Sequence, residues 1–264
     1  MIRQASRAEL SHYQKLKQKK FRREFCQFTA EGLNLFRQVK HLPGWFHFIL
    51  IEDAFYYQHS DEFRDLPENL FKSASLRELG ELSETENPQP ILFILNNRYQ
   101  QFKPDFSSLN RILYLFGLQD PGNAGTLLRT AAWFGWDAVV FSHDSVDWTN
   151  PKVIRSSMGS FSSCPVFEDS KERELLAAAG KTMAGYFLDM DGIPINQAKG
   201  TKHPVCLVVG NEANGFSGYD PFSYFSESKK VHIPGHADRI ESLNAGIAGS
   251  IALFQLAGNK NFGQ

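Results

Sequence analysis

A glycine-containing turn followed by an arginine is the first candidate for chemistry in this sequence. It occupies residues 120–131, Asp-Pro-Gly-Asn-Ala-Gly-Thr-Leu-Leu-Arg-Thr-Ala, after an apolar stretch typical of a strand. Asn123 is a suitable helix N-cap, and Arg129 would stand in the second turn of that helix. Free backbone N–H groups at a helix start, beside an arginine, favour a phosphate. A capped helix with a solvated arginine is the alternative interpretation.

Two further polar segments also follow apolar stretches. Residues 208–216 read Val-Val-Gly-Asn-Glu-Ala-Asn-Gly-Phe, a strand end that breaks into a polar loop flanked by glycines. Residues 233–235 are Ile-Pro-Gly, and 241–250 are Glu-Ser-Leu-Asn-Ala-Gly-Ile-Ala-Gly-Ser, whose small side chains permit close helix packing. In open α/β sheets, ligands bind outside the carboxyl ends of strands. The segments therefore stand where such a fold places its sites.

Other patterns fail on spacing. Gly180-Lys181-Thr182 resembles the end of a P-loop, but Leu175 stands where that motif needs a glycine. His232 and His236 are four residues apart, yet the proline and glycine between them exclude a shared helix face. The three cysteines are too far apart for a metal ribbon and are expected to be buried thiols. We therefore expect no metal site.

The elements that would position the three segments alternate between short β-rich stretches and helical ones, which predicts an α/β fold. The polar residues 96–110 predict a domain boundary. Before it, we expect a helix over about 7–20 and strands at 24–30, 46–51, 70–73 and 91–95. After it, we expect strands at 112–118, 138–141, 182–188, 204–209 and 231–233, with helices at 124–134, 171–179 and 242–257. The later strands are continuous apolar runs, as in a parallel sheet covered on both faces.

The charge is distributed unevenly. The 264 residues have a net charge of -1 at pH 7, which argues against a generally basic nucleic-acid coat but not against a local basic patch. Residues 1–30 hold eight Lys and Arg and two Glu, a net +6, so the remainder carries −7. No stretch approaches the roughly 18 apolar residues of a membrane helix, and the N-terminus lacks the apolar run of a signal peptide. A cytoplasmic protein is expected.

In order and spacing, the three segments resemble the motifs of the SpoU (TrmH-like) RNA 2′-O-ribose methyltransferases of the SPOUT class. The match at 120–131 is highly specific, and those at 210–216 and 233–244 add to it. Residues 15–32 are similar to the start of the small ribosomal-protein-like substrate-binding domain of many members. The chain departs from the family at 245–247, where Ala-Gly-Ile replaces the more usual Val-Ser-Val. We expect this departure to affect helix packing or a dimer face more than chemistry.

The resemblance implies an α/β fold in two parts. Residues 111–264 would form a SPOUT trefoil-knot domain with a mainly parallel sheet, a rare exception to the rule against knotted chains. Residues 1–100 would form a small α/β RNA-binding domain, joined by a linker at 101–110. The family uses S-adenosylmethionine and is usually a homodimer with its active site at the subunit interface. The implied cofactor-binding residues are Leu188, Gly210, Asn211, Ile233 and Leu243.

The implied reaction is the attack of a ribose 2′-hydroxyl on the sulfonium methyl group, which needs no metal. The protein must hold the reacting groups in line and help to remove a weakly acidic proton. Arg129 is better suited to bind the neighbouring phosphate and stabilise the developing alkoxide than to act as the base, because a neutral guanidine is costly to form. Asn123 and Asn244 would orient Arg129 or the ribose. Ser242 would bond the substrate or cofactor, and Glu212 would fix its loop or polarise a partner; the general base stays open.

The basic N-terminal stretch is the expected contact with RNA. Its candidates are Lys15, Lys19, Lys20, Arg22 and Arg23, with Phe21, Phe25 and Phe28 as stacking groups. Ribosomal RNA is the expected substrate, by analogy with members that carry a similar N-terminal domain. A non-catalytic RNA-binding or ribosome-assembly factor with this fold, a tRNA ribose methyltransferase, and a methyltransferase for a substrate other than RNA stay open as alternatives.

Overall fold

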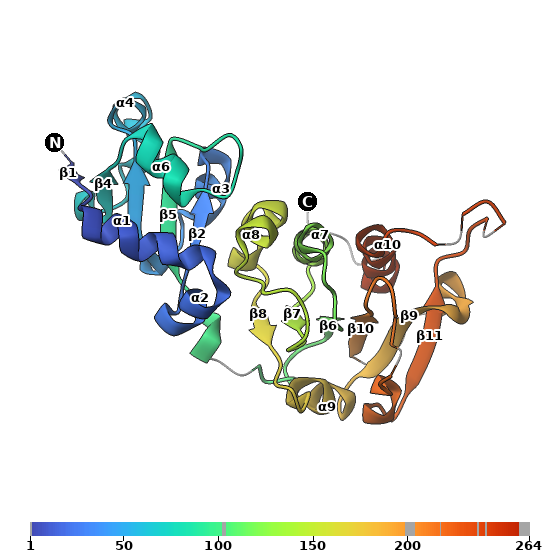
Figure 1. The fold of residues 1–264 in the computed structure, drawn as a ribbon. Coiled ribbons are helices and arrows are strands. Elements are labelled where there is room, and N and C mark those ends of the chain that lie inside the picture. Colours follow the sequence, from blue (N-terminus) through green and yellow to red (C-terminus); the bar gives the residue numbers. More distant parts are fainter. Residues whose placement is uncertain are drawn as a thin grey trace. The chain divides into compact units, whose positions relative to one another are not determined.

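The structure is a computed structural model that describes residues 2–101, 104–198, 204–216, 218–236, 238–240 and 242–258. The chain divides into two compact units, each with its own sheet (Figure 1). The first unit comprises Met1–Gln101 and Thr149–Ser162, and the second comprises Phe102–Trp148 and Ser163–Gln264. Residues 149–162 therefore group with the first unit, although they lie inside the sequence range expected for the knot domain.

The first unit has a five-stranded mixed sheet of order β1-β4-β3-β5-β2. Its strands are β1 (Arg3–Gln4), β2 (Gln27–Glu31), β3 (Phe46–Ile51), β4 (Phe71–Ser73) and β5 (Ile91–Asn96). β5 runs antiparallel to both neighbours, whereas β3 and β1 run parallel to β4. The helices are α1 (Arg7–Gln14), α2 (Lys19–Phe25), α3 (Leu33–Val39), α4 (Asp53–Gln58), α5 (Ser60–Phe63), α6 (Leu76–Leu82) and α8 (Pro151–Ser157). Short 3-10 turns are η1 (Lys15–Lys17), η2 (Pro43–Trp45), η3 (Glu68–Leu70), η4 (Tyr99–Gln101) and η5 (Ser160–Ser162).

The N-terminal helix differs from its prediction at its end. Ser6 and Glu9 form the capping box that starts α1, with the Glu9 carboxylate accepting the Ser6 N–H at 2.8 Å. α1 ends at Gln14 and η1 follows it, but Gln18 is extended with ψ 130° and separates η1 from α2. α2 then ends at Cys26, which adopts a left-handed conformation with φ 52°. The strand expected from residue 24 therefore begins at Gln27, because α2 occupies the residues before it.

Residues 149–162 belong to the first unit through aromatic packing. The Phe161 ring meets Phe28 edge-on at 5.6 Å and stacks with Trp45 at 5.9 Å between centroids. The Tyr99 hydroxyl donates a hydrogen bond to the Phe161 carbonyl at 2.7 Å. Gly159 has φ +80°, and a Cβ there would lie 3.0–3.1 Å from three side chains of α3. A glycine is therefore strongly favoured at this turn.

The second unit has a six-stranded sheet of order β11-β9-β10-β6-β7-β8, in which all pairs are parallel. Its strands are β6 (Arg111–Leu115), β7 (Ala138–Phe141), β8 (Val166–Glu168), β9 (Ala184–Pro194), β10 (Val205–Val209) and β11 (Ser228–His232). The helices are α7 (Pro121–Trp133), α9 (Glu174–Gly180) and α10 (Ala245–Ala257), and the 3-10 turns are η6 (Ile195–Gln197) and η7 (Pro221–Tyr224). The predicted parallel sheet is confirmed, with β8 as a strand that the sequence did not indicate.

Both faces of this sheet are covered. Cys206 and Val208 of β10 join a core cluster with Leu176 of α9. Val209 alternates to the opposite face, where Gly249 of α10 approaches it. There α10 packs on α7, and a Cβ on Gly249 would lie 2.5 Å from Leu127 Cδ2. Burial on both faces explains why the strands are continuous apolar runs. Among the described residues, no helix is long and apolar enough to cross a membrane.

Candidate functional site

The carboxyl ends of the central strands meet at one edge of the second sheet. Leu115 of β6 and Leu188 of β9 both pair in register with Val209 of β10. The loops that carry the first two sequence segments start within a few residues of Leu115 and Val209. The third segment follows β11, whose His232 pairs with Pro194 at the far end of β9. The loops after parallel strands are therefore gathered where such sheets bind ligands.

The loop after β10 is held by Asn211. Its side-chain Nδ2 donates to the Gly117 carbonyl at 2.8 Å, and its Oδ1 accepts the N–H groups of Ala213 and Asn214 at 3.0 Å each. Its backbone N–H donates to Gly215 O at 3.1 Å. The Asn211 side chain is thus committed to the loop, which makes it a positioning residue within this structure. A Cβ on Gly210 would lie 2.9 Å from Gly215 O, so residue 210 must be glycine for the loop to close.

Glu212 joins the loop after β10 to the start of α7. Its carboxylate accepts the backbone N–H of Gln119 at 3.1 Å and that of Asp120 at 3.0 Å. It also accepts Nδ2 of Asn123 at 3.3 Å. One carboxylate therefore fixes three donors on the segment before and inside the first turn of α7. This geometry supports the loop-fixing role expected for Glu212.

The N-cap of α7 differs from the prediction. Asp120, not Asn123, caps the helix: its Oδ1 accepts the Asn123 N–H at 2.7 Å, and Pro121 follows at the first helical position. A proline is favoured there because its missing N–H would have no partner in the helix. The prediction that Asn123 is the cap is therefore wrong. Asn123 lies inside the first turn, which leaves its side chain to face Glu212.

The side chains of Asn123 and Asn244 approach each other over Gly246. Asn244 is the N-cap of α10, and its Oδ1 accepts the Ile247 N–H at 3.2 Å. A Cβ on Gly246 would lie 3.0 Å from Asn123 Oδ1 and 3.1 Å from Asn244 Oδ1. The glycine therefore gives the two amides the room they occupy, so the departure from the family at residue 246, expected to affect mainly helix packing or a dimer face, lies at the site itself. The structure thus brings together three of the five expected catalytic residues, Asn123, Glu212 and Asn244.

Arg129 stands apart from these three. It is exposed on α7 and makes no hydrogen bond or ion pair with the described part of the chain. Arg129 lies six positions after Asn123, which places the two side chains about 120° apart around the helix. Arg129 therefore points from a different face of α7 and is open to a partner from outside this chain.

Leu188 lies inside β9, whereas the other remaining site residues lie in the segment between β11 and α10. Leu188 and Ile233 are half-buried, Ser242 is exposed, and Leu243 is 45% exposed. Glu241, part of the third sequence motif, lies outside the described residues.

A charged network behind the site was missed by sequence reasoning. The Arg173 guanidinium donates to both carboxylate oxygens of Asp144, at 3.2 and 3.1 Å, and lies 4.1 Å from the centre of the Phe116 ring. Asp144 accepts the Ser142 hydroxyl at 2.6 Å, and that hydroxyl oxygen accepts the Gly117 N–H at 2.8 Å. Partial burial acts to raise the pKa of Asp144, but the Arg173 and Ser142 hydrogen bonds outweigh it and hold the pKa below its usual value.

This network supports Gly117, the residue whose carbonyl receives Asn211. Arg173 and Asp144 lie 29 positions apart and in no recognisable motif, so the sequence carries no local signal for the pair. Their positions after β8 and β7 are the one clue, because the loops after neighbouring parallel strands share an edge of the sheet.

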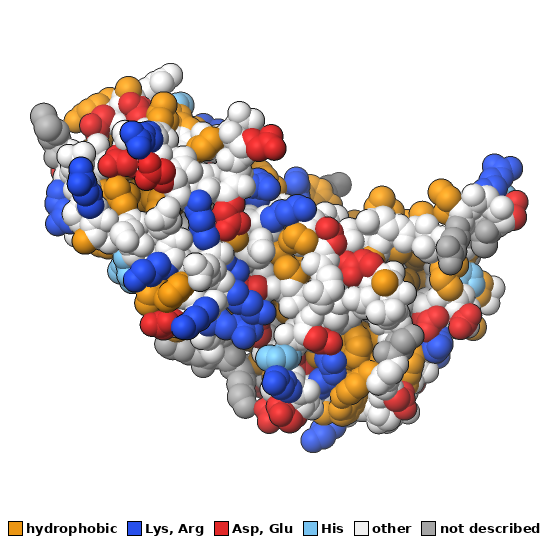
Figure 2. All heavy atoms as spheres, in the orientation of Figure 1, with side chains coloured by type: hydrophobic (Ala, Val, Ile, Leu, Met, Phe, Trp, Pro, Cys, Tyr) orange, Lys and Arg blue, Asp and Glu red, His pale blue; other side chains and the backbone are white. Residues whose placement is uncertain are grey.

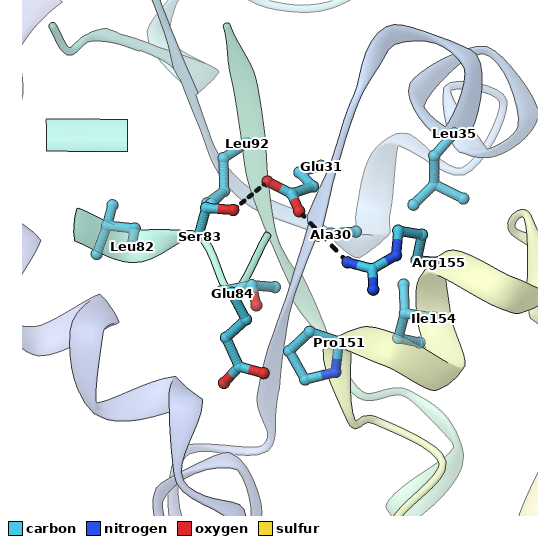
Figure 3. A pocket seen from close by; sticks show the side chains of 11 residues that line it. Ala30, Glu31, Leu35, Leu82, Ser83, Glu84, Leu92, Pro151, Ile154 and Arg155 are labelled. Atoms are coloured by element: carbon cyan, nitrogen blue, oxygen red, sulfur yellow. Dashed lines mark hydrogen bonds and ion pairs between the residues drawn. The ribbon is translucent and has the colours of Figure 1, made fainter. Parts of the chain in front are cut away.

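The pocket between β2, α6 and α8 does not extend the site. Figure 3 shows the Glu31 carboxylate between Ser83 and Arg155; it accepts the Ser83 hydroxyl at 2.7 Å and lies 4.0 Å from Arg155 Nη1. The cavity measures about 10 Å³, which is the space of about one water molecule. Among the residues that the structure describes, no group of three or more His, Cys, Asp or Glu side chains could hold a metal.

Four of the five expected RNA contacts are exposed. They are Lys15, Lys19, Lys20 and Arg23. The prediction that Arg22 contacts RNA is wrong: the residue is only 4% exposed and donates to the carbonyls of Leu16 and Lys17 at 2.9 and 2.8 Å. Its guanidinium also donates to Thr149 Oγ1 at 3.2 Å, so it holds the fold together and cannot reach RNA. The ring of Phe28 is fully buried and is likewise removed from the stacking groups.

The fold and site define an α/β protein whose functional loops gather at the carboxyl edge of a parallel sheet. Residues 110–254 match the SpoU rRNA Methylase family. The match covers more than half of the sequence, and the chain belongs to this family.

The chain is also similar to individual rRNA methyltransferases and their structures. The chain is similar to the 23S rRNA (guanosine(2553)-2′-O)-methyltransferase RlmP of Bacillus subtilis, at 29% identity over 97% of this chain and 99% of that protein. An AdoMet-bound rRNA methyltransferase structure from Sinorhizobium meliloti has a TM-score of 0.77 at 24% identity, over 96% of this chain and 95% of that one. The SpoU methyltransferase AviRb from Streptomyces viridochromogenes, in complex with AdoMet, has a TM-score of 0.79 at 19% identity, over 98% and 100%. These two structures share the fold of both units.

Proposed function

We propose that this protein transfers a methyl group from S-adenosylmethionine to a ribose 2′-hydroxyl of ribosomal RNA. The observation that carries the proposal is the meeting of three sequence motifs at one edge of the sheet, where Glu212 joins the first two and Gly246 brings Asn123 to Asn244. The family membership and the printed activity of the Bacillus relative support the same reaction.

The loops at this edge fit the cofactor. Gly210 sits in a backbone cradle that a Cβ would fill, and nearby loops leave apolar side chains in solvent, among them Leu243 at 45% and Ile240 at 67% exposed. Backbone groups together with exposed apolar side chains suit an adenosine, whose adenine base is flat and has polar edges. We propose that Leu188, Gly210, Ile233 and Leu243 hold it, with Asn211 fixing the loop. When bound, S-adenosylmethionine supplies an electrophilic methyl group on a sulfonium.

The residues of the chain supply positioning and charge. Asn123 and Asn244 orient the ribose, and Ser242 bonds the substrate or the cofactor carboxylate. Glu212 holds the N-terminus of α7 in place. Arg129, exposed and without a partner in the described residues, binds the phosphate beside the reacting ribose and stabilises the developing alkoxide. Holding the nucleophile and the methyl group in line lowers the activation free energy by several kcal/mol.

The first unit is proposed to capture the RNA. Its exposed Lys15, Lys19, Lys20 and Arg23 carry a positive charge that suits phosphates. Residues 1–100 would serve as the RNA-binding part, 101–110 as the linker and 111–264 as the catalytic part, except that residues 149–162 group with the first unit. The protein would then act in the cytoplasm, where it meets its substrate.

We further propose a homodimer that forms through α7 and α10. Four large apolar side chains stand exposed on these helices, which is unusual for a surface that stays in water. They are Trp133 at 80%, Phe254 at 54%, Ile247 at 53% and Ile251 at 39%. Trp133 lies four residues after Arg129 and so shares its helix face. A second subunit seated there would lie beside Arg129 and complete the active site.

The proposed trefoil knot has its support in the strand order. β10 lies between β9 and β6, although β7, β8 and β9 separate it from β6 in sequence, and α10 returns to pack on α7.

The proposed dimer can be tested at the apolar face of α7 and α10. Ile251→Asp should leave a monomer in analytical ultracentrifugation if the dimer uses this face. A dimer that survives that substitution would contradict the proposed interface.

The central test is transfer of a radiolabelled methyl group from S-adenosylmethionine to ribosomal RNA, followed by digestion and identification of a 2′-O-methylnucleoside. Arg129→Ala should abolish transfer while calorimetry finds nearly unchanged cofactor affinity. Arg77→Ala, which removes an arginine 88% exposed on α6, is the matched control and should keep activity. Unchanged transfer by Arg129→Ala would overturn its role. Absence of cofactor binding by the wild type would instead favour the non-catalytic alternative.

A further inference from the structure

Three stacked rings form a partly buried surface patch on α1 and α2, named the aromatic face: His12, Phe21 and Phe25. The rings of His12 and Phe25 stack with centroids 4.3 Å apart and planes 25° apart. Phe21 and Phe25 stack at 5.7 Å and 28°. All three residues are half-buried, so each keeps some area in contact with solvent.

Cations surround the aromatic face. The Nζ atoms of Lys15 and Lys20 each lie 5.7 Å from the centre of the Phe21 ring. Residues 15–25 hold six Lys and Arg and one carboxylate, Glu24. Figure 2 shows Lys and Arg side chains gathered around hydrophobic ones over this part of the first unit. The surface therefore combines flat rings with a positive rim.

The aromatic face is also fixed in place. Phe25 packs against the core cluster that contains Tyr13 and Leu16. Arg22, on the same helix, anchors α2 through its buried hydrogen bonds to Leu16 and Lys17. Phe21 and Phe25 are four residues apart and share one side of α2. A ligand would thus meet rings that are already ordered, which reduces the entropy lost on binding.

We propose that the aromatic face stacks an unpaired nucleobase of the RNA, an inference that rests on the proposed function. Aromatic rings stack on single-stranded bases, and lysines beside them hold the flanking phosphates. A base inside a duplex presents only its edges and cannot reach a ring in this way. The lysines therefore attract any RNA, whereas Phe21 and its stacked neighbours select an unpaired nucleotide.

A second ring pair in the same unit has acidic neighbours in place of lysines. Phe55 and His59 on α4 have centroids 4.3 Å apart, the same separation as His12 and Phe25. Their neighbours include the carboxylates of Glu52 and Asp53, which repel phosphates. Ring pairing alone therefore does not predict an RNA contact, and Phe55 provides a matched control.

The test measures binding of the full chain to a labelled unpaired RNA oligonucleotide and to a blunt RNA duplex, by fluorescence anisotropy over a range of salt concentrations. Phe21→Leu keeps an apolar side chain but removes the aromatic ring, so it should weaken binding of the unpaired RNA about fivefold or more. Its salt dependence should stay unchanged, because no phosphate contact is lost. Lys20→Ala should weaken the binding of both RNAs and flatten its dependence on salt concentration. Phe55→Leu should change neither, and Phe21→Trp should bind like the wild type.

Unchanged binding by Phe21→Leu, or an equal loss on unpaired RNA and duplex, would overturn the proposal, as would Phe21→Trp behaving like Phe21→Leu. Thermal unfolding of each variant shows that it is folded. The methyl-transfer assay separates this inference from the proposed function. A wild type that methylates ribosomal RNA while Phe21→Leu binds normally contradicts only the aromatic face. A wild type that binds unpaired RNA through Phe21 but transfers no methyl group contradicts only the proposed function.

Discussion

Gly246→Ala should separate activity from stability, because a methyl group at this position meets the two site asparagines. The new Cβ would lie 3.0 Å from Asn123 Oδ1, 3.1 Å from Asn244 Oδ1 and 3.3 Å from Asn123 Cα. An ordinary contact begins near 3.4 Å, so each amide must retreat by a few tenths of an ångström. Asn244 would then lengthen its 3.2 Å bond to the Ile247 N–H, and Asn123 its 3.3 Å bond to Glu212.

The opposing contributions to stability nearly cancel. Replacing a helical glycine with alanine stabilises by up to about 1 kcal/mol, and less in the first turn. Weakening the Asn244 cap costs about 1 kcal/mol. The free energy of unfolding should therefore change by less than about 1 kcal/mol. The rate should fall about tenfold or more, because a 1 Å misplacement of positioning groups can cost on the order of 10².

The assay is kcat for methyl transfer to ribosomal RNA, measured beside thermal unfolding. Gly80→Ala is the matched control: it is also a helical glycine, in α6 of the first unit, and its Cβ would make only an ordinary 3.5 Å contact with Pro88 Cγ. It should raise the melting temperature and leave kcat unchanged. A Gly246→Ala protein with wild-type kcat would refute the argument that the two asparagines need this space.

Three further predictions follow from other contacts. Arg22→Met should lower the free energy of unfolding by about 2–3 kcal/mol in urea titrations, because it leaves buried carbonyls without their charged donor. The hydrogen bond from Lys72 is the main cause that lowers the pKa of Glu9 from 4.5 to about 2. The unfolded chain therefore binds the proton more readily, so stability should fall as the pH drops from about 4.5 to 2, and Glu9→Gln should flatten that fall. Asp144→Asn should weaken cofactor binding about tenfold in calorimetry. The substitution removes the charge-assisted hydrogen bond from Arg173, worth about 1.5 kcal/mol, that supports the loop beneath the site. Wild-type affinity of this variant would contradict that role.

Local sequence patterns predicted those features that depend on neighbours along the chain. Apolar runs gave the central strands of the second sheet, and the capping box at Ser6 gave the start of α1. Patterns were weaker where two local signals compete. Asp120 and Asn123 are both good caps, and the position of Pro121 decides between them. Strand β8 has only three residues, too few for a period to appear.

The sequence by itself determined that this is an α/β chain whose three polar motifs each follow a strand, because residue type and spacing act within a few turns of backbone. The tertiary structure decided which of those residues meet. Glu212 reaches Asn123 across 89 positions, and Arg173 reaches Asp144 across 29. It also decided that Arg22 is a buried anchor while Lys19 and Lys20 are exposed, although all three read as basic surface residues. The reason is physical: a side chain's partners and its burial depend on elements packed against it from distant parts of the chain, and no local pattern records them.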